Sequence, residues 1–123
     1  MKFIVAVGIG SLIGGISRYL LTQYVQEKFF SSFPYGTFTV NVLGCLLIGI
    51  VFGFAERDTL GTVWKLFLIT GILGGFTTFS SFSNETVFLL RNGKAMVALL
   101  NVLGSVVLGV LATFAGLYIS KLL

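Results

Sequence analysis

Four long runs of apolar residues, separated by short polar stretches, organise the chain. The runs cover residues 3–26, 37–55, 66–90 and 95–120. Three breaks divide them: "EKFFSSFPYG" holds the only proline, "ERDTLGT" is rich in charge, and "RNGK" holds an Asn-Gly turn signal. A membrane-spanning helix needs about 20 mostly apolar residues, whereas strands of a membrane β-barrel alternate apolar and polar positions. No run alternates in that way, so the pattern predicts an all-α integral membrane protein with four transmembrane helices.

Composition supports a chain that lies almost wholly in the membrane. Of its 123 residues 56% are hydrophobic and only 10% are charged, where a soluble domain carries about 25% charged residues. We therefore expect one membrane domain over residues 1–123. The first run is too long for the apolar part of a signal peptide, and we expect it to remain as the first helix.

Few residues of this chain could carry chemistry. It has no histidine and one cysteine, Cys45, which we interpret as a small packing residue within the second run. No acid–base pair or side-chain metal site can be assembled from this set, so we expect no enzyme activity. The basic residues are scattered singly, which is typical of helix ends in a membrane protein and predicts no nucleic-acid partner.

The charges at the two ends of the spans give almost no preferred orientation. Cytoplasmic ends normally carry the excess of Lys and Arg. With four spans, one side would hold four basic residues and the other three, or four if Arg18 inside the first run is included. This balance favours insertion in both orientations, which would allow two copies to form an antiparallel dimer. A dimer is also favoured because four helices are few to enclose a polar path. A single topology with a weak charge bias remains the alternative.

Small residues recur at spacings that let helices approach closely. Gly10 and Gly14, Gly49 and Gly53, and Ser105 and Gly109 are each four residues apart. Lipid is as apolar as the helix surfaces, so the hydrophobic effect does not drive helices together in a membrane. Close contact between backbones stabilises their association instead. We interpret these pairs as structural.

Polar residues within the runs are few, and lipid contact would be costly for each of them. They are Arg18 in the first run, Asn41 in the second, the segment Gly74–Glu85 in the third, and Asn101 with Ser105 in the fourth. We expect these side chains to face the interior of the bundle.

The segment "GGFTTFSSFSNE" from Gly74 combines glycines, hydroxyls, rings and a carboxylate. Helical spacing places Thr78, Ser81 and Glu85 on one stripe and the phenylalanines on another. The glycines weaken the helix, so we expect a break near residues 74–77, which membranes tolerate only where backbone is buried or lines water. Open carbonyls at such a break suit a cation such as Na⁺, and open N–H groups suit an anion. Ordinary packing of rings and local bonding of hydroxyls is the alternative.

The motif "GGFTTFSSFS", with "GGISRY", "GTFTVNVLG" and "NVLGS" elsewhere, resembles the Fluc/CrcB family of bacterial fluoride channels. The resemblance covers the whole chain. It implies an antiparallel, dual-topology homodimer in the bacterial plasma (inner) membrane, with two fluoride pathways and one central structural Na⁺. It further implies that fluoride leaves the cell passively and that the channel protects against fluoride toxicity. Pairing with a paralogous chain is left open.

The resemblance also implies roles for individual residues. The backbone carbonyls of Gly74 and Thr77 would hold Na⁺. The rings of Phe79 and Phe82 would line the fluoride pathways, and Phe76 is left as packing. The remaining pathway residues are Asn41, Thr78, Ser81, Glu85, Ser105, Arg18 and, more weakly, Asn101.

Physical chemistry is compatible with these roles. The edge of an aromatic ring is positive and can meet an anion, and hydroxyl and amide groups are donors that can replace the water around fluoride. Glu85 has the wrong sign for an anion path, so we expect it to be protonated, to swing away, or to pair with a basic side chain. The alternative function is a proton-coupled small multidrug-type exporter. That mechanism requires a carboxylate deep in the first helix, where this chain has Arg18 instead.

Overall fold

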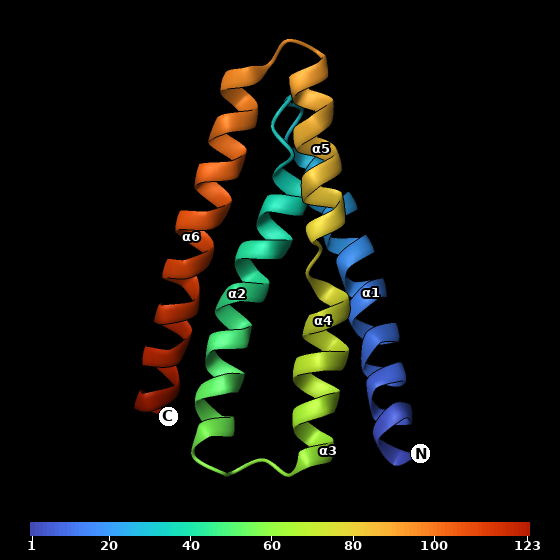
Figure 1. Cartoon of the computed structure of the whole chain (residues 1–123), viewed down its shortest axis with the longest axis vertical. Helices are drawn as coiled ribbons and strands as arrows, with labels where there is room; N and C mark the ends of the chain where they lie inside the picture. Colours follow the sequence, from blue (N-terminus) through green and yellow to red (C-terminus); the bar gives the residue numbers. More distant parts are fainter.

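The computed structural model describes all 123 residues as helices joined by short turns (Figure 1). Four helical segments run up and down, and each is long and apolar enough to cross a membrane. The predicted all-α membrane architecture with four spans is therefore confirmed at this level. The elements are α1 (Lys2–Lys28), α2 (Tyr35–Glu56), α3 (Thr62–Lys65), η1 (Leu66–Leu73), α4 (Gly74–Phe76), α5 (Phe79–Arg91) and α6 (Ala95–Leu122).

The third span consists of four of these elements, α3, η1, α4 and α5, in succession. Its eight-residue middle part, η1, is π-helical, a geometry with wider turns that is rare and mostly occurs in short pieces. The four helical segments enclose the ranges 3–26, 37–55, 66–90 and 95–120 that the hydrophobic pattern delimits.

Glycines set which helices lie closest. α1 packs on η1 and α4, and α2 packs on α6. A Cβ atom built at Gly10 would lie 2.9 Å from the Cα atom of Gly71, and one built at Gly116 would lie 3.0 Å from the Cα atom of Gly49. Backbones approach this closely only where no side chain intervenes, which is the role expected of small residues in membrane helices.

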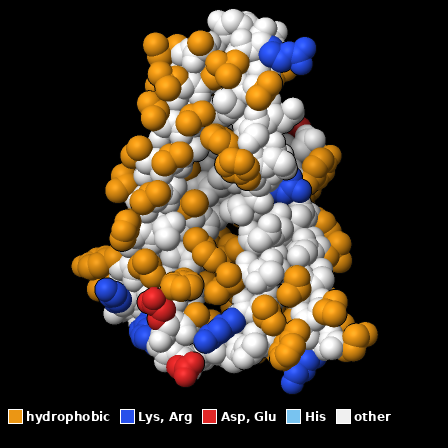
Figure 2. All heavy atoms as spheres, in the orientation of Figure 1, with side chains coloured by type: hydrophobic (Ala, Val, Ile, Leu, Met, Phe, Trp, Pro, Cys, Tyr) orange, Lys and Arg blue, Asp and Glu red, His pale blue; other side chains and the backbone are white.

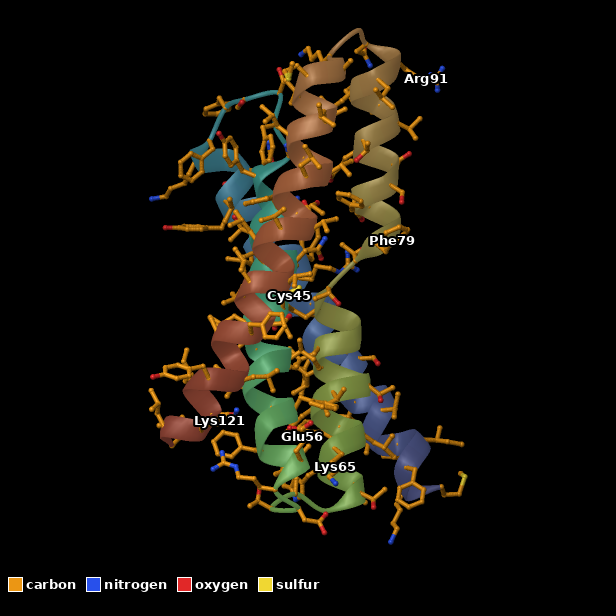
Figure 3. All side chains as sticks on the ribbon, turned by 60° about the vertical axis from the view of Figure 1, so that its left-hand side comes forward. Cys45, Glu56, Lys65, Phe79, Arg91 and Lys121 are labelled. Atoms are coloured by element: carbon orange, nitrogen blue, oxygen red, sulfur yellow. The ribbon has the colours of Figure 1, made fainter.

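The ends of the spans carry most of the charge. The N-terminus, the α2–α3 turn and the C-terminus lie at one end of the bundle, and the α1–α2 loop and α5–α6 turn lie at the other (Figure 1). In Figure 2 hydrophobic side chains cover much of the visible face between these ends. Figure 3 shows Glu56, Lys65 and Lys121 at the first end and Arg91 at the second.

Two local features fix the chain at the two ends of the bundle. The tight α5–α6 turn uses Gly93 with φ +74°, a left-handed conformation that glycine adopts without strain. At the opposite end the Arg57 guanidinium donates to the carbonyl oxygens of Gly53 and Ser120, and so joins the C-terminal ends of α2 and α6.

Large apolar side chains point outward along every span. Only 19 of the 123 residues are buried within the chain, while residues such as Leu12, Phe88 and Leu111 are more than half exposed. A monomer dissolved in water rarely exposes so large an apolar surface. The protein is a multi-pass membrane protein whose outer surface meets lipid or another protein.

Candidate functional site

Two extended residues interrupt the third span at mid-height. α4 ends at Phe76 and α5 begins at Phe79, while Thr77 (φ −84°, ψ 156°) and Thr78 (φ −148°, ψ 118°) have extended backbones. The interruption lies at the C-terminal end of the range expected from the sequence.

The two glycines before it are themselves helical. Gly75 serves close packing instead, because a Cβ atom there would lie 2.7 Å from the carbonyl oxygen of Ser11 on α1.

Side chains form hydrogen bonds with several backbone N–H and C=O groups that have no helical partner at the interruption. The N–H of Thr78 donates to Oδ1 of Asn41 at 2.8 Å, and Nδ2 of Asn41 donates to the carbonyl oxygen of Thr78 at 3.0 Å. The hydroxyl of Thr78 accepts from the N–H of Ser81 at 3.2 Å and so caps the start of α5. The N–H and hydroxyl of Thr77 both donate back to the carbonyl of Leu73.

Two carbonyls at the interruption stay open. In a continuous helix the N–H of Thr78 would donate to the carbonyl of Gly74, but that N–H is held by Asn41. The carbonyl of Thr77 accepts no backbone hydrogen bond. Between them, the carbonyl of Gly75 accepts from Nε of Arg18 at 3.2 Å. Gly74 and Thr77 therefore present oxygens of the kind that a hard cation binds, and these residues fit the Na⁺ site that the resemblance implies.

A polar cavity of about 570 Å³ lies on one side of the interruption, between α1, α2 and α5. It brings together four of the predicted residues: Arg18, Thr78, Ser81 and Glu85. The cavity also has polar lining that the sequence analysis did not select, namely Tyr19, Thr22, Gln23, Gln26, Glu27, Ser31 and Thr37.

Thr37 is the functional candidate that sequence reasoning missed most clearly. Its hydroxyl is buried and donates to Oε1 of Glu85 at 2.7 Å, while Oε2 of Glu85 is buried without a partner. A signal for it existed in the sequence. Thr37 precedes Asn41 by four residues and so lies on the same face of α2.

A second cavity of about 390 Å³ lies on the other side of the interruption. Asn41, Gly74, Thr77, Thr78 and Phe79 line it together with apolar residues. Thr78 lines both cavities. The two cavities thus meet at one residue of the interrupted span.

The three phenylalanines of the motif have different surroundings. Phe76 is buried, as expected of a packing residue. The Phe79 ring is 79% exposed and lies 5.7 Å, centroid to centroid, from the ring of Phe82. Figure 3 shows Phe79 at the start of α5 and Cys45 below it, nearer the middle of the bundle. The half-buried Cys45 lines the second cavity as a free thiol.

Asn101 and Ser105 form a separate group between α5 and α6. Asn101 is 1% exposed and donates to the hydroxyl of Thr86 at 3.2 Å, and Ser105 donates to Oδ1 of Asn101 at 3.4 Å. Thr86 in turn donates to the carbonyl of Phe82 at 2.8 Å. Neither Asn101 nor Ser105 lines the two cavities, so their link to the other predicted residues runs through the backbone of Phe82.

The fold and this site define a multi-pass membrane protein with a polar, interrupted span between two cavities. Comparison with known proteins places it more closely. The sequence profile of the family described as "CrcB-like protein, Camphor Resistance (CrcB)" matches residues 5–117, and the chain belongs to this family.

Relatives of nearly equal length share this similarity. The "Fluoride-specific ion channel FluC" of Flavobacterium psychrophilum is 44% identical over 122 residues, which are 98% of each chain. The protein of the same name from Phocaeicola vulgatus is 40% identical over 121 residues, 98% of this chain and 100% of the relative. That of a Nitratiruptor species is 43% identical over 118 residues, 96% of this chain and 91% of the relative.

Proposed function

We propose that this chain forms a fluoride-selective channel through which F⁻ leaves the cell passively, down its electrochemical gradient. The observation that carries the ion's identity is the similarity over nearly the whole chain to proteins named fluoride-specific ion channels. The family is an ion channel family and the chain is not an enzyme, as its composition predicted. A proton-coupled exporter is not favoured, because that mechanism requires a carboxylate deep in the first helix, whereas the only charged residue away from the ends of α1 is Arg18.

The groups around the interruption suit a small anion that holds water tightly. The hydroxyls of Ser81 and Thr78, the second N–H of the Asn41 amide and the positive edges of the Phe79 and Phe82 rings are donors. Ser81 and Thr78 line the first cavity, and Thr78, Asn41 and Phe79 line the second. Several weak sites in sequence allow an ion both to enter and to leave, which conduction requires.

Arg18 and Glu85 give the first cavity its electrostatic character. The Arg18 guanidinium faces the cavity and attracts anions toward its mouth. The Thr37 hydroxyl donates to one oxygen of the Glu85 carboxyl. In the proposed function this carboxyl bonds to polar groups that line the pathway rather than to fluoride. Asn101 and Ser105 stabilise the path indirectly. Ser105 donates to Asn101, Asn101 donates to Thr86, and the Thr86 hydroxyl donates to the backbone carbonyl of Phe82.

The pathway is completed by a second copy of the chain in the opposite orientation. The open carbonyl oxygens of Gly74 and Thr77, beside the second cavity, have no partner within one chain, and lipid would leave them unpaired. The balanced charges at the two ends allow copies to insert both ways. Two protomers would then supply two pathways in a bacterial plasma (inner) membrane.

Na⁺ fits between the protomers as a structural ion. The open carbonyl oxygens of Gly74 and Thr77 would hold it, two from each copy. When bound, the ion supplies a fixed positive charge that lowers the cost of bringing an anion out of water. The interruption lets the third span present those oxygens without a charged side chain.

The proposal is tested with purified protein in liposomes loaded with fluoride. A fluoride electrode follows efflux when a K⁺ gradient and ionophore set the membrane potential. We expect fast efflux that follows the voltage, excludes chloride and needs no pH gradient. Efflux that depends strictly on a pH gradient would instead identify a coupled exporter.

The antiparallel arrangement is tested separately. In a Cys45→Ser background, Lys94→Cys places one thiol at the end of the bundle formed by the α5–α6 turn. A membrane-impermeant thiol reagent added to intact cells should label about half of the molecules. Labelling of all or none would mean a single topology and a parallel pair. Lys65→Cys, at the opposite end, is the matched control and should also be about half labelled.

A further inference from the structure

The side-chain amide of Asn41 binds both backbone groups of one residue at the interruption. Its oxygen accepts from the Thr78 N–H at 2.8 Å, and its nitrogen donates to the Thr78 carbonyl at 3.0 Å. This is the pairing that a neighbouring strand would give to an extended residue. No other side chain in the structure binds the N–H and the carbonyl of the same residue.

This pairing competes directly with helix formation. If Thr78 were helical, its N–H would donate to the Gly74 carbonyl and close the span. At this depth an N–H without any partner is costly, so Thr78 must donate to one acceptor or the other. Because Asn41 supplies the acceptor, the Gly74 oxygen remains open.

The backbone around Asn41 is fixed by close packing. Val40 is completely buried. One turn further along α2, Gly44 lies so near the Thr77 methyl group that an added Cβ atom would collide with it. α2 therefore lies directly against the interrupted residues, and the Asn41 amide has little freedom to move away from Thr78.

We propose that Asn41 is a positioning residue, which keeps the third span open at Thr78 and thereby reserves the Gly74 carbonyl for a cation. This inference rests on the proposed function for the identity of the ion, Na⁺. It assigns to Asn41 a task distinct from contact with fluoride. One N–H of its amide remains free for the pathway, while the rest of the amide shapes the backbone.

The test measures Na⁺ binding without any fluoride. Purified full-length protein is unfolded by heat while Na⁺ replaces N-methyl-D-glucamine at constant ionic strength, since an ion that binds only the folded state raises the Tm. We expect Asn41→Leu to raise the half-saturating Na⁺ concentration at least tenfold. The matched control is Asn101→Leu, which removes a buried amide that bonds only side chains and should change this concentration less than twofold.

Equal half-saturation in Asn41→Leu and the wild-type protein would overturn the proposal and would leave the channel function standing. Loss of Na⁺ binding in Asn101→Leu as well would also overturn it, because the effect would then be general. A residue that only contacts fluoride would not change this fluoride-free measurement.

A second measurement needs no variant and covers the case in which Asn41→Leu does not fold. Amide hydrogen exchange, followed by NMR, compares Thr78 with Thr77, whose N–H donates to the carbonyl of Leu73. We expect the two rates to agree within tenfold. Faster exchange at Thr78 would overturn the role of Asn41. A wild-type protein that does not respond to Na⁺ would refute the cation site of the proposed function, and the Thr78 rate would still decide whether Asn41 holds the backbone.

Discussion

The two faces of α2 are built from similar small residues but pack in opposite ways. Toward α6, Gly49 and Gly53 meet Gly116 and Ser120 so closely that added Cβ atoms would lie 3.0 Å or less from the opposite helix. We refer to these four residues as the α2–α6 seam. Toward the third span, the same helix presents Thr37, Asn41 and Gly44 beside cavities of about 570 and 390 Å³.

The difference separates stability from function. The seam leaves no space for an ion, and its one side-chain hydroxyl, that of Ser120, donates within its own helix to the Leu117 carbonyl. The opposite face bonds its polar groups across helices, from Asn41 to Thr78 and from Thr37 to Glu85. One helix thus holds the bundle together on one side and forms the polar site on the other. Changes at the seam should therefore lower the free energy of unfolding most, whereas changes on the opposite face should cost less stability or reduce fluoride transport.

The largest expected effect is at the seam. Gly116→Ala should lower the free energy of unfolding by about 3 kcal/mol, because the new Cβ atom would lie 2.8 Å from the backbone nitrogen of Ile50 and no flexible side chain can yield. Unfolding by SDS in mixed micelles measures this. Gly15→Ala is the control, since no atom lies within 4 Å of its Cβ position, and it should cause no loss. Equal stability of the two variants would contradict the close seam.

On the polar face, Thr37→Val should lower the free energy of unfolding by about 1–2 kcal/mol. The change leaves both oxygens of the Glu85 carboxyl without a partner at a buried position. The same unfolding assay applies. Thr39→Val is the matched control, because Thr39 is only half-buried and its hydroxyl makes no hydrogen bond to another residue. If Thr37→Val and Thr39→Val lowered the free energy of unfolding equally, the Thr37–Glu85 hydrogen bond would contribute nothing to stability.

Phe79→Ile should reduce fluoride efflux from liposomes by about tenfold with little change in stability. Isoleucine keeps apolar bulk but lacks the positive ring edge, whose interactions are worth up to about 1.5 kcal/mol. Phe114→Ile on α6 is the control, since Phe114 is also a largely exposed ring but lies far along the chain from the interruption. Unchanged efflux in Phe79→Ile would exclude a role for this ring edge.

The smallest expected effect is at the cavity mouth. Arg18→Gln should reduce fluoride efflux about threefold at low ionic strength and less as salt is added, because a partly exposed charge acts over a distance that salt shortens. Efflux is compared at about 10 mM and 1 M inert salt. Lys28→Gln, at the end of the same helix, is the control and should have a weaker effect. A loss that does not vary with salt would assign Arg18 to its bond with Gly75 alone.

Much of the fold could be predicted from the sequence because hydrophobic length is a strong signal in membranes. The four runs lie within the four helical segments of the structure. The exact place of the interruption could not be predicted in the same way. Its position depends on which backbone group Asn41 reaches across the helix interface, and a single sequence does not reveal that pairing.

Residue type alone selected several of the candidate site residues. Arg18, Ser81 and Glu85 stand out in an apolar chain, and the structure brings them to one cavity. Thr37 did not stand out, because threonine is common in membrane helices and its importance comes from the Glu85 carboxyl 48 residues away. Asn101 stood out by type, yet its partners place it behind Phe82 rather than on a cavity wall.

The interruption also has a consequence for how the protein enters the membrane. α5 has 13 residues, or about 20 Å of helix, and cannot cross a hydrocarbon core of about 30 Å by itself. The third span is also the least hydropathic of the four. Ribosomes make α2 before the third span, so Asn41 is already in the bilayer when the unpaired backbone of Thr78 arrives. The order of the helices in the gene thus places the partner of the Thr78 backbone in the membrane before the least hydropathic span arrives.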